Sequence, residues 1–257
     1  TPFPPQGILW LVRNLDIDGV YLDGAPYERA ILRRLRAALE PLTKSRSAPF
    51  LLDLHASCAG NPHLPYTELF PYIDSIWFGE QCDYSAYSPE MWLAEVAGIP
   101  FGLPAQILGN NRDQWQGLVF GMTCRIYPDP HTCNPRPIWR ALDAMQMSRP
   151  RLLGWWEPDC PIQTDAPDVK ASLLLAKESG SAAIVLANWG RGERRVSLQI
   201  DWASLNALGV GISQTSARLH APPIDGFQPG GTFSATQSVT VQGKGSGDNE
   251  GWLFHLK

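Results

Sequence analysis

Three short apolar segments in the first third of the chain each end in polar side chains. The segments are residues 19–22, 50–52 and 75–78, and the polar residues after them are Asp23, then Asp53 and His55, then Glu80. Short apolar runs of this kind are typical of a parallel sheet that is buried on both faces. In such sheets the ligand site lies outside the carboxyl ends of the strands. The sequence therefore predicts a polar site at one rim of a parallel sheet.

Helical patterns lie between and around these segments. Four apolar residues recur at helical spacing between residues 28 and 40, namely Ile31, Leu32, Leu35 and Leu39. We expect Pro41 to end this helix, and we interpret the arginines on its other side as a solvated face. Residues 1–16 are expected to form a helix that leads into the first strand. Ser88 is expected to cap a further helix that ends near Gly98.

The pattern of alternating strands and helices continues to about residue 147. A fourth strand is expected over residues 101–108, with Gln106 near its end, although Pro104 suits a central strand poorly. A helix over residues 112–120 precedes the segment 121–127, which contains Arg125 and is interpreted as the last strand of this sheet. A helix over residues 137–147 follows it.

From residue 151 the helical periodicity ends and short strands alternate with Gly, Pro and Asn. Seven strands are expected, at residues 152–156, 171–177, 182–187, 195–200, 216–219, 238–241 and 252–256. This pattern is typical of an antiparallel β-sandwich. We therefore place a domain boundary near residue 150, with a β/α portion at 1–150 and a β-sandwich at 151–257.

The β/α portion is too short for a complete eight-stranded barrel. A (β/α)8 barrel needs about 250 residues, whereas residues 1–150 supply only four or five β/α units. The proline-rich start and the absence of an initiating methionine favour the second half of a barrel. The predicted fold is thus α/β followed by all-β: the C-terminal part of a (β/α)8 TIM-type barrel, incomplete at its N-terminus, and then a sandwich. An upstream part of the same polypeptide or a partner chain would complete the barrel.

Composition excludes several classes of function. The 257 residues carry a net charge of −4, which provides no basic surface for nucleic acid. No apolar stretch approaches the roughly 18 residues that a membrane span requires. We find no phosphate-binding loop and no dinucleotide fingerprint, so no cofactor is expected. Ten tryptophans are many for this length, and they fit either a large core or a carbohydrate-active protein.

The five cysteines do not follow a metal-binding spacing. Cys58, Cys82 and Cys124 follow the predicted strand ends, so two of them could pair near the rim. Cys124 could instead pair with Cys133 and close a short loop. Because the number of cysteines is odd, at least one thiol is expected outside an intrachain disulfide. The localisation stays unknown, with a secreted or extracytoplasmic site as one option.

The order of several motifs resembles one known family. The segments DGVYLDG, LLDLH, ELFPYIDSIWFGE, AGIPFGLPAQILG and GLVFGMTCR resemble the catalytic barrel of proteins related to glycoside hydrolase family 123. In the second half, VLANWG, VSLQIDWASL, ARLHAPPIDGFQ and GWLFHL resemble the β-sandwich that ends those proteins. The resemblance implies a glycosidase barrel with an accessory sandwich. It also implies a carbohydrate substrate.

The resemblance does not extend to the catalytic pair. Characterised members of the family are N-acetylgalactosaminidases that use an adjacent Asp-Glu pair, with the acetamido group of the substrate as nucleophile. Here Asp23 is followed by Gly24, so the adjacent pair is missing at the matching strand end. If the upstream strands exist, Asp23 follows the fourth barrel strand and Glu80 follows the sixth. A nucleophilic Asp and an acid/base at these two positions also resemble the layout of the α-galactosidase-like clan.

Glycoside hydrolysis requires two carboxyl groups on either side of one sugar bond. We assign Asp23 as nucleophile or base and Glu80 as general acid, with Trp77 as an apolar wall that would raise the pKa of Glu80. Asp53 and His55 lie on the same side of their strand, because they are two positions apart along it. They are expected to bind substrate hydroxyls or tune the pair, together with Trp77, Gln106 and Arg125 as further substrate-binding residues.

Two alternatives compete with this assignment. Asp53, His55 and Glu80 could bind a metal ion, but three such ligands that do not all come from one strand are weak evidence, and we expect no metal. The chain could also be a catalytically silent relative that serves as a carbohydrate-binding or structural module. An enzyme requires Asp23 and Glu80 to share one open cleft, whereas a silent module does not.

Overall fold

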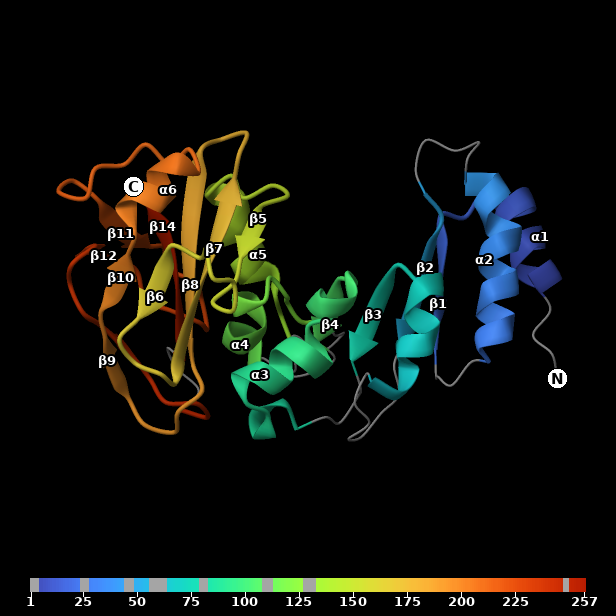
Figure 1. Cartoon of the computed structure of the whole chain (residues 1–257), viewed down its shortest axis with the longest axis horizontal. Coiled ribbons are helices and arrows are strands. Elements are labelled where there is room, and N and C mark those ends of the chain that lie inside the picture. Colours follow the sequence, from blue (N-terminus) through green and yellow to red (C-terminus); the bar gives the residue numbers. More distant parts are fainter. Residues whose placement is uncertain are drawn as a thin grey trace. The chain divides into compact units, whose positions relative to one another are not determined.

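The computed structural model describes residues 5–23, 28–43, 49–55, 64–78, 83–107, 113–126, 133–246 and 250–257. The chain forms two compact units, residues 1–109 and 110–257. Figure 1 shows the elements of both units.

The first unit contains a four-stranded sheet. Its strands, in spatial as well as sequence order, are β1 (Gly19–Leu22), β2 (Leu51–His55), β3 (Ser75–Phe78) and β4 (Ala105–Ile107). Every neighbouring pair is parallel. This confirms the predicted parallel sheet, and it places the carboxyl ends of β1, β2 and β3 at one rim.

The two faces of this sheet differ in burial. One face carries residues that are at most 5% exposed, namely Leu22, Leu52, Leu54, Ile76 and Ile107. On the opposite face, Tyr21 is 43% exposed and Leu51 is 49% exposed. The prediction of a sheet buried on both faces is therefore wrong for the described residues. Alternation along each strand sends Asp53 and His55 to this second, less covered face.

Two helices accompany the first strands, α1 (Pro5–Leu15) and α2 (Arg29–Thr43), and lie on one side of β1 and β2 in Figure 1. Leu32, Leu35 and Leu39 are almost fully buried, as their spacing predicts. The helix does not end at Pro41, which lies inside its last turn. Proline holds φ near the helical value, so a final turn can continue past it with the loss of one hydrogen bond.

Arg36 departs from the solvated helix face that we expect for the arginines. Its Nη2 lies 2.5 Å from Oδ2 of Asp74, and its Nε donates to the carbonyl of Tyr72 at 3.1 Å. The same Asp74 oxygen accepts the backbone N–H of Leu52 at 2.7 Å. The pair therefore ties α2 to β2 and to the turn before β3.

Short helical segments complete the first unit. They are η1 (Leu64–Tyr72), η2 (Tyr84–Ala86), α3 (Pro89–Met91), the π-helical η3 (Trp92–Val96) and η4 (Ile99–Phe101). Ser88 caps α3 by accepting the N–H of Met91, as predicted. β4 is shorter than the expected strand 101–108, because η4 occupies its start and Pro104, which has no N–H, lies directly before the observed strand.

The second unit is built on a six-stranded antiparallel sheet. Its spatial order is β12 (Gly231–Ser234), β11 (Arg218–Ala221), β14 (Gly251–Leu256), β8 (Ser181–Asn188), β7 (Val169–Ala176) and β5 (Arg151–Leu153). Two further strand pairs are β6 (Ile162–Thr164) with β10 (Leu198–Ile200), and β9 (Arg194–Val196) with β13 (Val239–Val241). These pairs confirm the predicted sandwich.

Separate hydrophobic cores cover the two faces of the six-stranded sheet. Along β8, Ile184 and Leu186 face the core shared with the two strand pairs. Ala183 and Val185 face the other core, which contains residues of α4 (Gln114–Val119) and α5 (Arg136–Ala144). Both helices therefore belong to the compact unit of the sandwich, although the sequence places a domain boundary later, near residue 150. That boundary stays a prediction.

The segment after α4 is not the predicted strand. In the described part of residues 121–127, which ends at 126, no strand of the four-stranded sheet occurs. Gly121 has a φ of 74° and its N–H donates to Leu118, while the N–H of Met122 donates to Gly117. This pair of hydrogen bonds is a Schellman motif, which ends a helix. The residues directly after α4 therefore form its C-terminal cap.

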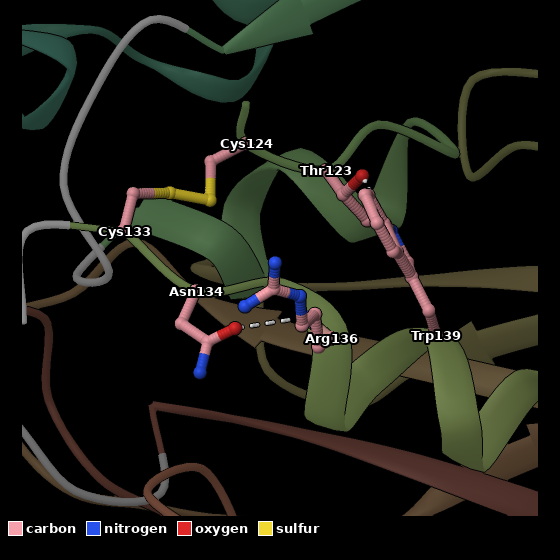
Figure 2. The surroundings of a disulfide bond; sticks show 6 residues. All are labelled: Thr123, Cys124, Cys133, Asn134, Arg136 and Trp139. Atoms are coloured by element: carbon pink, nitrogen blue, oxygen red, sulfur yellow. Dashed lines mark hydrogen bonds between the residues drawn. A yellow bond between two sulfur atoms is a disulfide. The ribbon is translucent and has the colours of Figure 1, made fainter. Parts of the chain in front are cut away.

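A disulfide joins Cys124 to Cys133, which is one of the pairings left open by the sequence (Figure 2). Beside it, the indole N–H of Trp139 donates to Oγ1 of Thr123 at 3.0 Å. Cys160 is a buried free thiol, and burial raises its pKa above the ordinary value. Cys58 and Cys82 lie outside the described residues.

Three elements of the second unit are missing from the sequence prediction. They are β6, β12 and α6 (Trp202–Ala207). The two strands have only three and four residues, too few for a clear alternation. A signal for α6 was present in the sequence, because Asp201 accepts the N–H groups of Ala203 and Ser204 as an N-cap.

No helix that the structure describes is long and apolar enough to cross a membrane.

Candidate functional site

The end of β1 brings Asp23 to the buried imidazole of His55 at the end of β2. Oδ1 of Asp23 lies 2.8 Å from Nδ1 of His55. The Asp23 side chain is 75% exposed, whereas the His55 side chain is only 7% exposed. The register explains the contact, since Leu22 pairs with Leu54 and the next residue on each strand follows it. The site thus has an accessible carboxylate supported by a covered imidazole.

Asp53 forms a second polar group on the same face, directed along the sheet. Its Oδ1 accepts the hydroxyl of Ser75 at 2.7 Å, and its Oδ2 accepts the indole N–H of Trp77. Asp53 and Ser75 are register partners on β2 and β3. Both carboxylate oxygens are therefore used to hold β3 side chains.

Aromatic rings surround these polar groups. The ring of Tyr21 stacks on the imidazole of His55 at a centroid distance of 6.1 Å. It meets the ring of Trp77 edge-on at 6.3 Å. Tyr21 and Ser75 are absent from the predicted site. The alternation of side chains along a strand could have identified both. It sends Tyr21 on β1 and Ser75 on β3 to the same face of the sheet as Asp53.

The remaining predicted site residues have different outcomes. Gln106 is exposed on β4 and pairs with Trp77 in the register, so it lies on the same sheet face. Arg125 is exposed but belongs to the second compact unit. Glu80 lies outside the described residues. The structure thus brings Asp23, His55, Asp53, Trp77 and Gln106 together on one face of the sheet.

The chemistry of this face suits a polyhydroxylated ligand. An exposed carboxylate can accept or transfer a proton, and an indole or phenol ring offers an apolar surface with a polar edge. Within the described ranges there is no cluster of three or more His, Cys, Asp or Glu side chains that could hold a metal ion. The ligands proposed for a metal include Glu80, which is not described.

Comparisons with known proteins agree with this architecture. A model of the glycoside hydrolase 123 TIM-barrel domain matches residues 3–127, and a model of the glycoside hydrolase 123 C-terminal domain matches residues 134–257. A search of curated proteins gave no match. The two family models together cover almost the whole chain.

Among solved structures, the chain is similar to a noncanonic maltogenic alpha-amylase, AmyB, from Thermotoga neapolitana. The TM-score is 0.54 at 11% sequence identity, and the match covers 98% of this chain and 65% of that chain. This likeness concerns the fold. A TIM-barrel portion followed by a β-sandwich, matched in order by both domain models, shows that the chain belongs to the glycoside hydrolase 123 family.

Proposed function

We propose that this protein hydrolyses glycosidic bonds of an oligosaccharide or polysaccharide, with Asp23 and Glu80 as the carboxylate pair. The observation that carries the proposal is the 75% exposed carboxylate of Asp23 at the rim of the barrel sheet, supported by His55. Asp23 follows β1 at this rim, and Glu80 follows β3 in the sequence. Glycosidases with a barrel place their acid and base or nucleophile at such a rim.

The aromatic residues of the site are proposed to bind the sugar ring. Trp77 is held by Asp53, and Tyr21 remains 43% exposed next to it. Because both Asp53 oxygens accept hydrogen bonds from β3, we assign Asp53 to holding Trp77 in place. Gln106 on the adjacent strand and Arg125 remain candidates for contacts with substrate hydroxyls.

The barrel is proposed to be completed by strands outside this chain. A TIM barrel closes with eight parallel strands, whereas the described residues supply a sheet of four with β1 and β4 at its edges. The chain also spans only 65% of the amylase chain that it resembles. A preceding part of the same polypeptide is the simplest source, and a partner chain is the alternative.

The test is hydrolysis by the full natural polypeptide that contains this chain. Aryl glycosides and polysaccharides form the substrate panel, and Asp23→Asn and Glu80→Gln are the variants. Each variant should lower kcat about 10²- to 10⁴-fold, which is the usual contribution of such groups. Glu178→Gln, an exposed carboxylate in a turn of the second unit, serves as the control and should leave kcat unchanged.

A silent binding module predicts the opposite pattern. The absence of a Glu next to Asp23 supports this second candidate. In that case calorimetry would detect oligosaccharide binding with no turnover in any variant. Turnover that persists unchanged in both carboxylate variants would contradict the proposed pair.

A further inference from the structure

His55 is a buried histidine with only one of its ring nitrogens engaged. The residue is 6% exposed. Nδ1 contacts Oδ1 of Asp23 at 2.8 Å, while Nε2 is buried and has no hydrogen-bond partner among the residues that the structure describes. A buried polar atom without a partner is rare in proteins. It loses its hydrogen bonds to water on folding and gains none in return, which costs free energy. The burial of an unpaired ring nitrogen therefore suggests that His55 has a role beyond packing.

The contact with Asp23 determines which nitrogen carries the proton. An ionised carboxylate can only accept hydrogen bonds, so Nδ1 of His55 must be the donor. In the neutral ring, Nε2 is then the nitrogen without a proton. The geometry thus places the proton of the neutral ring on Nδ1.

The surroundings hold the imidazole in this orientation. The Tyr21 ring stacks on it with an interplanar angle of 24°, and Trp77 is its register partner on β3. Within the described ranges, the titratable groups on the same sheet face are Tyr21 from β1, Asp23 directly after β1, and Asp53 from its own strand. The β3 strand itself, Ser75–Phe78, contains no ionisable side chain. Because Nε2 is covered, His55 cannot itself contact a sugar.

We propose that His55 is a positioning residue that acts on the substrate only through Asp23. By donating its Nδ1–H to one oxygen of an otherwise accessible carboxylate, it fixes the orientation of the group that we assign as nucleophile or base. This inference rests on the proposed function for its consequence in catalysis. The proton position on the ring, however, can be tested without any activity.

Two substitutions separate positioning from packing. His55→Phe keeps a flat ring under Tyr21 but removes the donor, whereas His55→Asn keeps an N–H near the place of Nδ1 but removes the ring. Positioning predicts that His55→Phe lowers kcat about tenfold to a hundredfold with little change in KM, and that His55→Asn recovers most of the loss. Packing alone predicts the reverse order, with His55→Phe the more active variant, and that result would overturn the proposal.

The ring itself provides the second readout. Nitrogen-15 NMR of the imidazole should show a protonated Nδ1 and an unprotonated Nε2 for the neutral form of His55. In the Asp23→Ala variant, which changes only an exposed side chain, the proton should redistribute toward Nε2. A wild-type spectrum with the proton on Nε2 would refute the dyad even if the enzyme is active. If no glycoside is hydrolysed but the proton is on Nδ1, the proposed function fails while the dyad stands.

Discussion

His255 on β14 lies directly opposite His220 on β11, so two imidazoles share one side of a strand pair. Burial lowers the pKa of His255 below its ordinary value of 6.5, and the positive charges of Lys257 and His220 lower it further. The unfolded chain therefore binds this proton more readily than the folded chain does. The associated stability is fully present above pH 6.5 and is lost as the pH falls below that value toward the lowered pKa.

Replacing His255 should remove this part of the acid sensitivity. In urea unfolding at pH 7.5 and pH 5.5, the His255→Gln variant should lose less unfolding free energy between the two conditions than the wild type. His220→Gln, which removes one of the two positive neighbours, should fall between them. An identical pH dependence in the wild type and His255→Gln would show that the His255 proton does not contribute.

At the scale of elements, the contact between α4 and the six-stranded sheet depends on a glycine. A Cβ added to Gly251 on β14 would lie 2.7 Å from Cδ2 of Trp115 on α4 and would also overlap the carbonyl of Leu186 on β8. Since that carbonyl belongs to the strand backbone, it cannot move aside cheaply. Gly251→Ala should therefore destabilise the protein by about 1–3 kcal/mol through overpacking.

Urea unfolding of matched glycine variants measures this effect. Gly211→Ala is the control, because a Cβ there meets no atom within 4 Å and its φ is not in the left-handed region. The control should change the unfolding free energy by less than about 0.5 kcal/mol. Equal unfolding free energies for Gly251→Ala and Gly211→Ala would mean that α4 moves to accommodate the added Cβ without loss of stability.

The sequence predicts elements best where the signal is local. The cap at Ser88, the strand cores of the parallel sheet and the common face of Asp53 and His55 all follow from spacing within a few residues. The pairing of His55 with Asp23 does not, since it depends on the register between β1 and β2. The segment after α4 is ambiguous, because apolar residues around Gly121 fit both a strand and a Schellman cap.

At the scale of the whole molecule, the two compact units differ in how completely they cover their apolar residues. The second unit has a core on each face of its main sheet. In the first unit, Trp10 is 57% and Leu15 59% exposed on α1, in addition to Tyr21 and Leu51 on the sheet. Exposed apolar side chains next to open strand edges favour association.

Separate expression of the two units tests this difference. Residues 110–257 should form a folded monomer, and residues 1–109 should self-associate at micromolar concentration. Light scattering coupled to size-exclusion chromatography gives the mass of each fragment, and circular dichroism gives its folding. A monomeric, cooperatively folded fragment 1–109 would show that its open face needs no partner.

The alternating side chains of β8 have a consequence for how the second unit unfolds. Ile184 and Leu186 contribute to one core while Ala183 and Val185 contribute to the other. Neither core can lose this strand without exposing the other to water, so the free energies of both are coupled through a single backbone segment. Calorimetry of this unit should accordingly give one transition, with equal calorimetric and van't Hoff enthalpies, rather than a separate melting event for each layer.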